Sequence, residues 1–373
     1  MPRWTDRDRQ YMQQALDLAI RGQGHVEPNP MVGCVIVKGH QIVGKGHHRK
    51  YGGAHAEVLA LRRAGSNAKG ATAYVTLEPC HHVGKTPPCV EALIDTGVRR
   101  VVVGMRDPNP LVAGHGLRAL RSAGLRVETG LLRDKAAALT APFMTYHLKR
   151  RPYVILKWAQ SIDGKIATRT GDSKWITSLQ SRKAGHALRA RVDAVVVGVG
   201  TVLSDDPDLT ARLVKPRRTA SRVILDTRLR TPVNARIVKT ARKTPTIIIT
   251  ASSGRGADRK RRSLERVGCE VITVRLNEGG IDLDKAMAEL HARQMTNILV
   301  EGGGKVLGAF VRCGLADEAR IFVAGKLIGG EHAPGPLRHH GPALMQDVIG
   351  VRVMGVLACG PDLCYIVGFG RND

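Results

Sequence analysis

Short apolar runs alternate with helical patterns along this chain of 373 residues, and the alternation occurs twice. In the first half, MVGCVIV, ATAYVTL and RRVVVGM predict strands, and AEVLALRRAG, VEALIDTGV and GLRALRSAG predict helices. In the second half the predicted strands are PYVILKWA, DAVVVGV, RVILDT, TIIIT, CEVITV and NILVEGG, with helical segments between several of them. Such alternation is typical of an α/β fold whose central sheet is covered by helices. The chain is therefore expected to form two α/β domains.

A charged segment that ends in proline, TYHLKRRP at 145–152, separates the two halves. Charged residues and proline interrupt regular structure, so we place the domain boundary here, with one domain at 1–148 and the other at 149–373. A chain of this length also suits two domains better than one. At the end of the second domain, VRVMGVLACGPDLCYIVGFG predicts an antiparallel hairpin around Gly360 and Pro361.

The sequence also bears on the cellular compartment. No apolar run approaches the roughly 20 residues that a membrane-spanning helix needs, so no membrane partner is expected. The segment 1–22 carries charges where a signal peptide has its apolar core, and it predicts an amphipathic helix with Thr5 as N-cap. The seven cysteines are odd in number and scattered, unlike a disulfide framework. A cytoplasmic protein is the expectation.

The net charge of +26 raises the question of a nucleic-acid partner. Basic residues are spread over both halves, however, and the one dense run is DRKRRSLER at 258–266. Aromatic residues make up only 3% of the chain, too few for a base-stacking surface of any size. A nucleic-acid partner is therefore not expected. Anionic small-molecule substrates or a generally basic proteome are the alternatives.

Histidine and cysteine residues gather in two nearby segments, GGAHAEVLAL and EPCHHVGKTPPC. Zinc binds imidazole nitrogen and cysteine sulfur, and a catalytic zinc keeps one of four positions for water. His55, Cys80 and Cys89 would supply three ligands and leave that position open. Glu57 follows His55 by two residues and lies on another face of the predicted helix, where it could carry protons for the bound water. Core packing and a Cys80–Cys89 disulfide are the alternatives, and the combined pattern favours zinc.

The pattern H-x-E followed by P-C…C resembles the zinc-dependent cytidine deaminase superfamily, although eight residues separate the cysteines here instead of two. The longer form PCHHVGKTPPC, with PNPMVGCVIV and DPNP, closely resembles the deaminase domain of the RibD family. Members of that family are bifunctional pyrimidine deaminases and reductases of riboflavin biosynthesis. The resemblance implies that Asn29, His48 and Lys85 contact the pyrimidine substrate. Taken singly, Asn29 is also typical of a turn and Lys85 of a solvated surface.

The second half lacks the G-x-G-x-x-G pattern of a Rossmann fold. Instead, VVVGVGTVLSDDPDLTAR follows a predicted strand, and ILVEGGGKVLGAF places three glycines between a strand and a helix. Backbone N–H groups at such a helix start suit the phosphates of a dinucleotide, although glycines also occur simply as loop residues. Arg189 and Arg212 could pair with a substrate phosphate, or could be ordinary surface residues.

The segments LKWAQSIDGKIAT, GDSKWITS, GVGTVLSDDPDLTAR and EGGG are similar, in order, to the reductase domain of the RibD family. The resemblance implies a dihydrofolate-reductase-like α/β fold after a cytidine-deaminase-like α/β/α domain, with NADPH as cofactor beside Zn²⁺. It implies that the cofactor is bound by Ala159, Trp175, Thr201, Asp205, Thr227, Gly302, Gly303 and Gly304. It implies that the substrate is contacted by Lys157, Ser173, Arg189, Leu209, Arg212 and Glu301. Lys157 could polarise the sugar carbonyl.

The resemblance implies two successive reactions. The first domain would deaminate 2,5-diamino-6-ribosylamino-4(3H)-pyrimidinone 5′-phosphate by attack of zinc-activated water, with Glu57 carrying protons. The second would use NADPH to reduce the ribosyl chain, giving 5-amino-6-(5-phosphoribitylamino)uracil. Two alternatives are an RNA or nucleotide deaminase with a basic accessory domain, and a zinc-stabilised binding module without catalysis. The partner is thus expected to be a phosphorylated pyrimidine, and the oligomeric state is open, with a homo-oligomer as one option.

Overall fold

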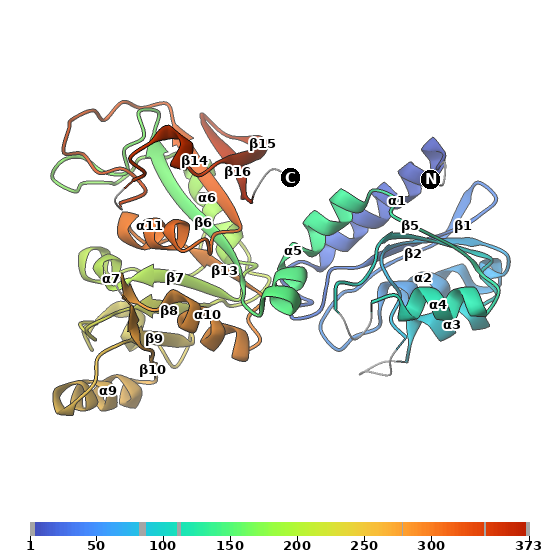
Figure 1. Ribbon diagram of the computed structural model, residues 1–373, viewed down its shortest axis with the longest axis horizontal. Helices are drawn as coiled ribbons and strands as arrows, with labels where there is room; N and C mark the ends of the chain where they lie inside the picture. The colour runs from blue at the N-terminus through green and yellow to red at the C-terminus, as the bar shows by residue number, and fades with distance from the viewer. Residues whose placement is uncertain (1–3, 82–86, 110–112, 278, 339–340, 371–373) are drawn as a thin grey trace. The chain divides into compact units, whose positions relative to one another are not determined.

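The computed structural model describes residues 4–81, 87–109, 113–277, 279–338 and 341–370. The chain divides into two compact units, Met1–Arg151 and Pro152–Asp373, and each has its own sheet and core (Figure 1). This division falls inside the charged segment 145–152. Both units are α/β structures, which confirms the predicted fold class. In the described residues, no helix is both long enough and apolar enough to cross a membrane.

In the described part of the first unit, five strands form a sheet in the order β2-β1-β3-β4-β5. The strand β1 is antiparallel to β2 and β3, whereas β3, β4 and β5 are parallel. The strands are β1 (Gly33–Lys38), β2 (Gln41–His47), β3 (Thr72–Leu77), β4 (Arg100–Met105) and β5 (Arg126–Thr129). The helices are α1 (Asp6–Ala19), α2 (Ala56–Ala64), α3 (Cys89–Asp95), α4 (His115–Ser122) and α5 (Arg133–Lys149).

Helices cover both faces of this sheet, as an α/β/α sandwich requires (Figure 1). On one face, Met12 and Leu16 of α1 and Ala136 of α5 pack against Val35 and Val102. The helices α2, α3 and α4 cover the other face. Thr5 caps α1 as predicted: its hydroxyl accepts from the Asp8 N–H, and the Asp8 carboxylate accepts from the Thr5 N–H.

A close approach between α2 and β2 sets the position of the start of α2. A Cβ at Gly46 would lie 2.2 Å from the carbonyl oxygen of Ala56, and one at Gly44 would lie 2.2 Å from that of Ala60. Only glycine leaves room for the helix backbone at this distance. The first turn of α2 is therefore seated directly on the β2 backbone.

In the second unit, the longest sheet among the described residues has nine strands in the order β10-β9-β8-β7-β13-β6-β14-β16-β15. The strands from β10 to β14 in this order are parallel, and β16 and β15 are antiparallel additions at one edge. The strands are β6 (Tyr153–Ser161), β7 (Ala194–Gly198), β8 (Ser221–Leu225), β9 (Thr246–Thr250), β10 (Glu270–Thr273), β13 (Asn297–Val300), β14 (Glu318–Ala324), β15 (Val351–Cys359) and β16 (Asp362–Phe369). A separate small ribbon pairs β11 (Leu276–Asn277) with β12 (Gly280–Ile281).

The predicted closing hairpin is present, because β15 and β16 pair from Val351 with Phe369 to Cys359 with Asp362, around Gly360 and Pro361. Helices lie on both faces of the large sheet, over two apolar clusters. The helices are α6 (Leu179–Arg189), α7 (Val199–Asp205), α8 (Arg236–Lys239), α9 (Arg255–Val267), α10 (Leu283–Ala292) and α11 (Gly304–Arg312).

Candidate active sites

Three metal-ligand side chains meet in the first unit. His55 is the N-cap of α2, Cys80 follows β3, and Cys89 is the first residue of α3. The His55 Nδ1 atom lies 3.1 Å from the Cys89 Sγ and 3.4 Å from the Cys80 Sγ, and the three ligand atoms all lie within 4.8 Å of one another. Both cysteines are free, so the disulfide alternative is wrong.

The donor set of this cluster fits a zinc ion. Zinc bonds of about 2.0–2.1 Å to nitrogen and 2.3 Å to sulfur put tetrahedral ligand atoms roughly 3.6 Å apart. The two nitrogen–sulfur distances are slightly shorter, so a small outward adjustment would admit the ion. The hydrogen bond from Cys89 and the nearby His55 lower the pKa of the Cys80 thiol despite burial, which favours the thiolate form that zinc binds. One imidazole and two thiols leave a fourth position for a reacting molecule.

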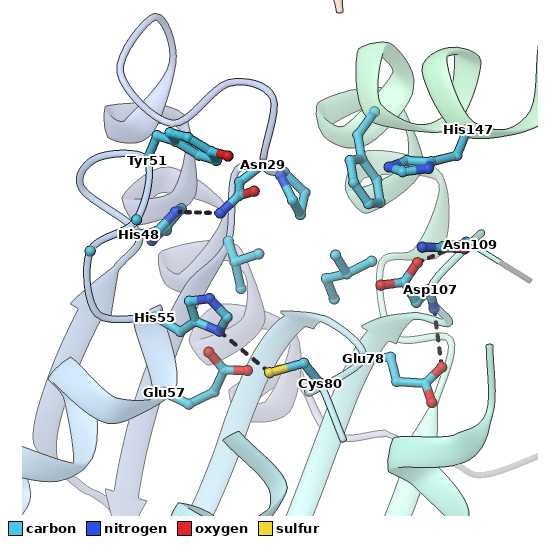
Figure 2. A pocket seen from close by; sticks show the side chains of 16 residues that line it. Asn29, His48, Tyr51, His55, Glu57, Glu78, Cys80, Asp107, Asn109 and His147 are labelled. Carbon is cyan, nitrogen blue, oxygen red and sulfur yellow. Dashed lines mark hydrogen bonds between the residues drawn. The ribbon is translucent and has the colours of Figure 1, made fainter. Parts of the chain in front are cut away.

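Glu57 lies beside this cluster, in the first turn of α2. Its side chain is buried, and Figure 2 shows its carboxylate facing His55 and Cys80. Burial raises the pKa of Glu57 to about 7. This is the arrangement expected of a general acid and base.

The cluster opens into a pocket of about 310 Å³ (Figure 2). At its wall, the Asn29 Nδ2 lies 3.3 Å from the His48 Nε2, and the His48 Nδ1 lies 3.2 Å from the Ala54 carbonyl oxygen. Burial lowers the pKa of His48, which favours a neutral imidazole. A neutral ring that donates from Nδ1 to Ala54 can accept from the Asn29 amide at Nε2. Asn29 and His48 therefore face the same pocket as the metal cluster, whereas Lys85 lies outside the described residues.

The polar residues at this pocket that were not among the predicted site residues are Tyr51, Glu78, Asp107, Asn109 and His147. The Glu78 carboxylate is buried and accepts from the backbone N–H groups of Asp107, Gly114 and Leu117, at 3.1, 3.0 and 3.2 Å. It thereby anchors the loop that brings Asp107 and Asn109 to the pocket. The DPNP motif contains both of these residues and could have led to them.

A second cluster of charged side chains lies in the other unit, where β6 and β13 run side by side. The Arg189 guanidinium donates to both Glu301 oxygens, from Nε and Nη2, at 2.7 Å each. Burial acts to raise the pKa of Glu301, but Arg189 and Lys157 outweigh it and hold the pKa at about 2. Burial also lowers the pKa of Lys157, although Glu301 opposes this. The register that pairs Val300 with Leu156 brings Lys157 and Glu301 together.

His186 was not predicted, yet it lies next to this cluster on α6. Its pKa is lowered to about 4 by burial and by the nearby charges of Arg189 and Arg212. The backbone N–H of Leu213 donates to its Nδ1 over 3.4 Å. The Arg212 side chain itself is largely exposed and lies 4.0 Å from the Asp208 carboxylate. Because His186 has no motif around it, only the folded chain identifies it.

Six of the eight predicted cofactor residues lie at or just after the carboxyl ends of neighbouring parallel strands, where open α/β sheets bind ligands. Ala159 is in β6, Thr201 follows β7, Thr227 follows β8, and Gly302, Gly303 and Gly304 follow β13. Asp205 ends α7 and is exposed. Trp175 is also exposed, and its ring lies 4.2 Å from the Arg182 guanidinium carbon. Ser173, two residues before Trp175, is exposed. The Leu209 side chain is buried, so only the Leu209 backbone could contact a ligand.

The three glycines after β13 differ in role. A Cβ at Gly302 would lie 2.7 Å from the Cβ of Val306, so this glycine permits the close packing of α11. A Cβ at Gly303 would meet nothing within 4 Å, and this residue is exposed at the N-cap of α11. Gly303 is therefore the position where a phosphate could approach the backbone most closely.

The fold and the two sites together define a class of two-domain enzyme, a zinc-dependent deaminase joined to an α/β reductase. The family model described as cytidine and deoxycytidylate deaminase zinc-binding region matches residues 5–105. The model described as RibD C-terminal domain matches residues 152–365.

Known proteins match over nearly the whole chain. The riboflavin biosynthesis protein RibD of Aquifex aeolicus is 44% identical over 95% of this chain and 97% of its own length. That of Escherichia coli K12 is 41% identical over 97% of this chain and 99% of its own. The solved structure of Acinetobacter baumannii RibD, form 1, has a TM-score of 0.84 at 38% identity and covers 98% of this chain and 99% of that one.

The chain belongs to the RibD family. It is a bifunctional deaminase and reductase of riboflavin biosynthesis, with Zn²⁺ and NADPH as its cofactors. The predicted family, activity and cofactors are thereby confirmed, and the alternative of a zinc-stabilised module without catalysis is wrong.

Proposed function

We propose that the two units act in succession on one phosphorylated pyrimidine. The first removes the 2-amino group of 2,5-diamino-6-ribosylamino-4(3H)-pyrimidinone 5′-phosphate, and the second reduces the ribosyl chain of the product to ribityl. The solved structure of a diaminohydroxyphosphoribosylaminopyrimidine deaminase/5-amino-6-(5-phosphoribosylamino)uracil reductase from Thermotoga maritima is 34% identical to this chain, with a TM-score of 0.84. The observation that carries the proposal is the convergence of His55, Cys80 and Cys89 beside the buried Glu57.

In the first reaction a carbon–oxygen bond forms at the amino-bearing ring carbon and the carbon–nitrogen bond breaks. His55, Cys80 and Cys89 would hold Zn²⁺, which when bound makes water nucleophilic near neutral pH. Glu57 accepts a proton from the attacking water and delivers it to the departing amine, so that ammonia leaves. The buried Glu57 carboxylate faces His55 and Cys80 (Figure 2), which suits this exchange.

The pyrimidine ring would be held against the metal cluster by Asn29 and His48. The Asn29 amide can donate to a ring carbonyl and accept from a ring N–H, while its contact with His48 fixes its orientation. Asp107 and Asn109 line the opposite side of the pocket and offer further acceptors to the amino groups of the substrate (Figure 2). We retain Lys85 as a contact to the substrate, on the motif alone.

In the second reaction NADPH supplies a hydride to the sugar carbon, and the sugar oxygen must gain a proton. Lys157 is suited to donate to that oxygen, because burial lowers its pKa and so makes its proton easier to release. Glu301 and Arg189 would fix sugar hydroxyl groups through the remaining lone pairs and N–H groups of their ion pair. Ser173, the Leu209 backbone and Arg212 would complete the contacts to the phosphorylated sugar.

The cofactor would lie across the carboxyl ends of β6, β7, β8 and β13. Gly303 leaves open space above its backbone, and the start of α11 favours a negative charge there. The other proposed contacts to NADPH are Ala159, Trp175, Thr201, Asp205, Thr227, Gly302 and Gly304. A coupled assay with the diaminopyrimidinone phosphate, Zn²⁺ and NADPH tests the whole scheme. Ammonia release must precede NADPH oxidation, and NADPH oxidation without prior ammonia release would contradict the proposed order.

We also propose that two copies of the chain pair along β15. This edge strand exposes apolar side chains, namely Val351, Val353, Met354, Val356 and Leu357. Exposed apolar edge strands invite pairing with another chain. Light scattering after size exclusion should give a dimer or a larger even assembly, and Val353→Lys should shift it toward monomer.

We propose a cytoplasmic location for the protein as well, because Cys80 and Cys89 must remain reduced to bind metal.

A further inference from the structure

Four arginines of the first unit line a second pocket, which takes no part in the reactions above. The pocket has a volume of about 550 Å³ and lies between the carboxyl ends of β4 and β5 and the starts of α4 and α5. We call this cavity the arginine pocket, after the four arginines that line it: Arg106, Arg118, Arg121 and Arg133. No aspartate or glutamate is among the described residues that line it.

The charges of this pocket are not neutralised within the part of the chain that the structure describes. None of the four arginines forms an ion pair there, and Arg106 donates only to the Ala113 carbonyl oxygen, over 2.7 Å. Elsewhere in the same unit, Arg100 pairs with both Asp8 and Glu128. Guanidinium groups gathered around one concavity repel each other, and a bound polyanion relieves that repulsion.

The arginine pocket is separate from the deaminase pocket, although the same loop borders both. Arg106 lines the arginine pocket and Asp107, the next residue, lines the deaminase pocket. The buried Glu78 lines the deaminase pocket, and its carboxylate accepts from the backbone N–H groups of Asp107, which lines the same pocket, and of Gly114, which lines the arginine pocket.

We propose that the arginine pocket binds a small molecule with two linked phosphate groups, such as a nucleoside diphosphate, at a site distinct from the deaminase centre. The planar guanidinium fork matches phosphate oxygens in pairs, and four forks exceed what one monophosphate can engage. The volume is within the roughly 300–1,000 Å³ range of small-molecule sites. A concave pocket of this kind suits a compact ligand better than a polynucleotide, which needs an extended basic groove.

Hydrogen–deuterium exchange on the full-length, zinc-loaded chain tests this proposal, with inorganic pyrophosphate as the probe. NADPH is left out because it carries two linked phosphates itself, and peptides of the reductase unit are followed separately from those of 113–133. Pyrophosphate is expected to slow exchange in peptides from 113–133. The double variant Arg118→Gln/Arg121→Gln should require roughly a hundredfold more pyrophosphate for the same protection, since each of the two lost charged hydrogen bonds weakens binding by about tenfold.

A matched control removes two exposed arginines of α9, Arg259→Gln/Arg262→Gln, and so changes net charge equally. It should keep the protection at 113–133. Absence of protection in the unaltered chain, or equal loss in both double variants, would overturn the proposal. Protection by a single-stranded RNA oligonucleotide but not by pyrophosphate would also overturn it. So would a tenfold rise in the deamination KM of Arg118→Gln/Arg121→Gln, because the pocket would then belong to the deaminase substrate.

Discussion

The two candidate sites of this chain are assembled in different ways. In the deaminase unit the proposed metal ligands and Glu57 come from two short segments, 55–57 and 80–89, and each of these ligands lies at or beside the start of a helix or the end of a strand. In the reductase unit the charged cluster draws Lys157, Arg189 and Glu301 from β6, α6 and the end of β13. The first site is local in sequence, whereas the second depends on strand order. A substitution in the first site should therefore affect mainly catalysis, whereas a substitution in the second site should affect both catalysis and the stability of the reductase unit.

The largest effect is expected from removal of a metal ligand. Cys80→Ser or Cys89→Ser should lose the zinc and reduce deamination to background, because serine is a poor zinc ligand. Metal analysis should give about one zinc per chain in the unaltered protein and close to none in the variants. Reduction of pre-deaminated substrate should continue. Cys313→Ser, at an exposed free cysteine of the other unit, serves as control, and zinc retention in both ligand variants would remove the basis of the deaminase site.

Glu57→Gln separates metal binding from proton transfer. The amide keeps the shape of the carboxylate but cannot carry a proton, so zinc should remain while deamination falls by about 10²–10⁴-fold. Ammonia release and metal content are measured on the same sample. Loss of reductase activity in a folded Glu57→Gln variant would mean that the two sites are not independent.

Glu301→Gln tests the coupling of chemistry and stability in the reductase unit. It leaves the nearly buried Arg189 without its carboxylate, and such a loss costs about 3–5 kcal/mol. Reductase turnover should fall, and inactivation of the reductase should need less urea. The control Glu289→Gln breaks a much more exposed pair with Arg293, which should cost less than about 1 kcal/mol. Equal urea midpoints for the two variants would show that the buried ion pair of Arg189 and Glu301 contributes no more to stability than the exposed pair of Arg293 and Glu289.

The same pair predicts a pH dependence. The pKa of Glu301 is held at about 2, below its ordinary 4.5, so the folded state favours the ionised carboxylate. Its contribution to stability is complete above about pH 4.5 and is lost as the pH falls toward 2. The difference in urea midpoint between the unaltered chain and Glu301→Gln should therefore shrink over that range. A difference that stays constant down to pH 2 would contradict the assignment.

The smallest effect is expected at Arg212, whose side chain is largely exposed. Arg212→Ala should raise the reductase KM for the phosphorylated substrate by roughly tenfold to a hundredfold, the value of a lost charged hydrogen bond. The KM for NADPH should change much less. Steady-state kinetics with each substrate varied in turn would measure both. An unchanged KM for this substrate would mean that its phosphate does not contact Arg212.

Sequence patterns were sufficient for features that depend on neighbours in the chain. The two α/β units, the Thr5 cap and the turn at Gly360 each follow from local residue types. Roles that depend on distant backbone contacts were not recoverable. Glu78 accepts from Asp107, Gly114 and Leu117, and nothing in EPC predicts those partners. The GGG run shows the same limit, since only folding reveals that Gly302 packs against Val306 while Gly303 is open.

The contact between Gly46 and Ala56 has a consequence for reading natural variation in this chain. A larger residue at position 46 would lift the first turn of α2, which carries His55 and Glu57. Zinc affinity can thus be destroyed from a strand position that offers the metal no donor atom. We therefore expect substitutions at Gly46 to lower deaminase activity, as substitutions of the proposed ligands do.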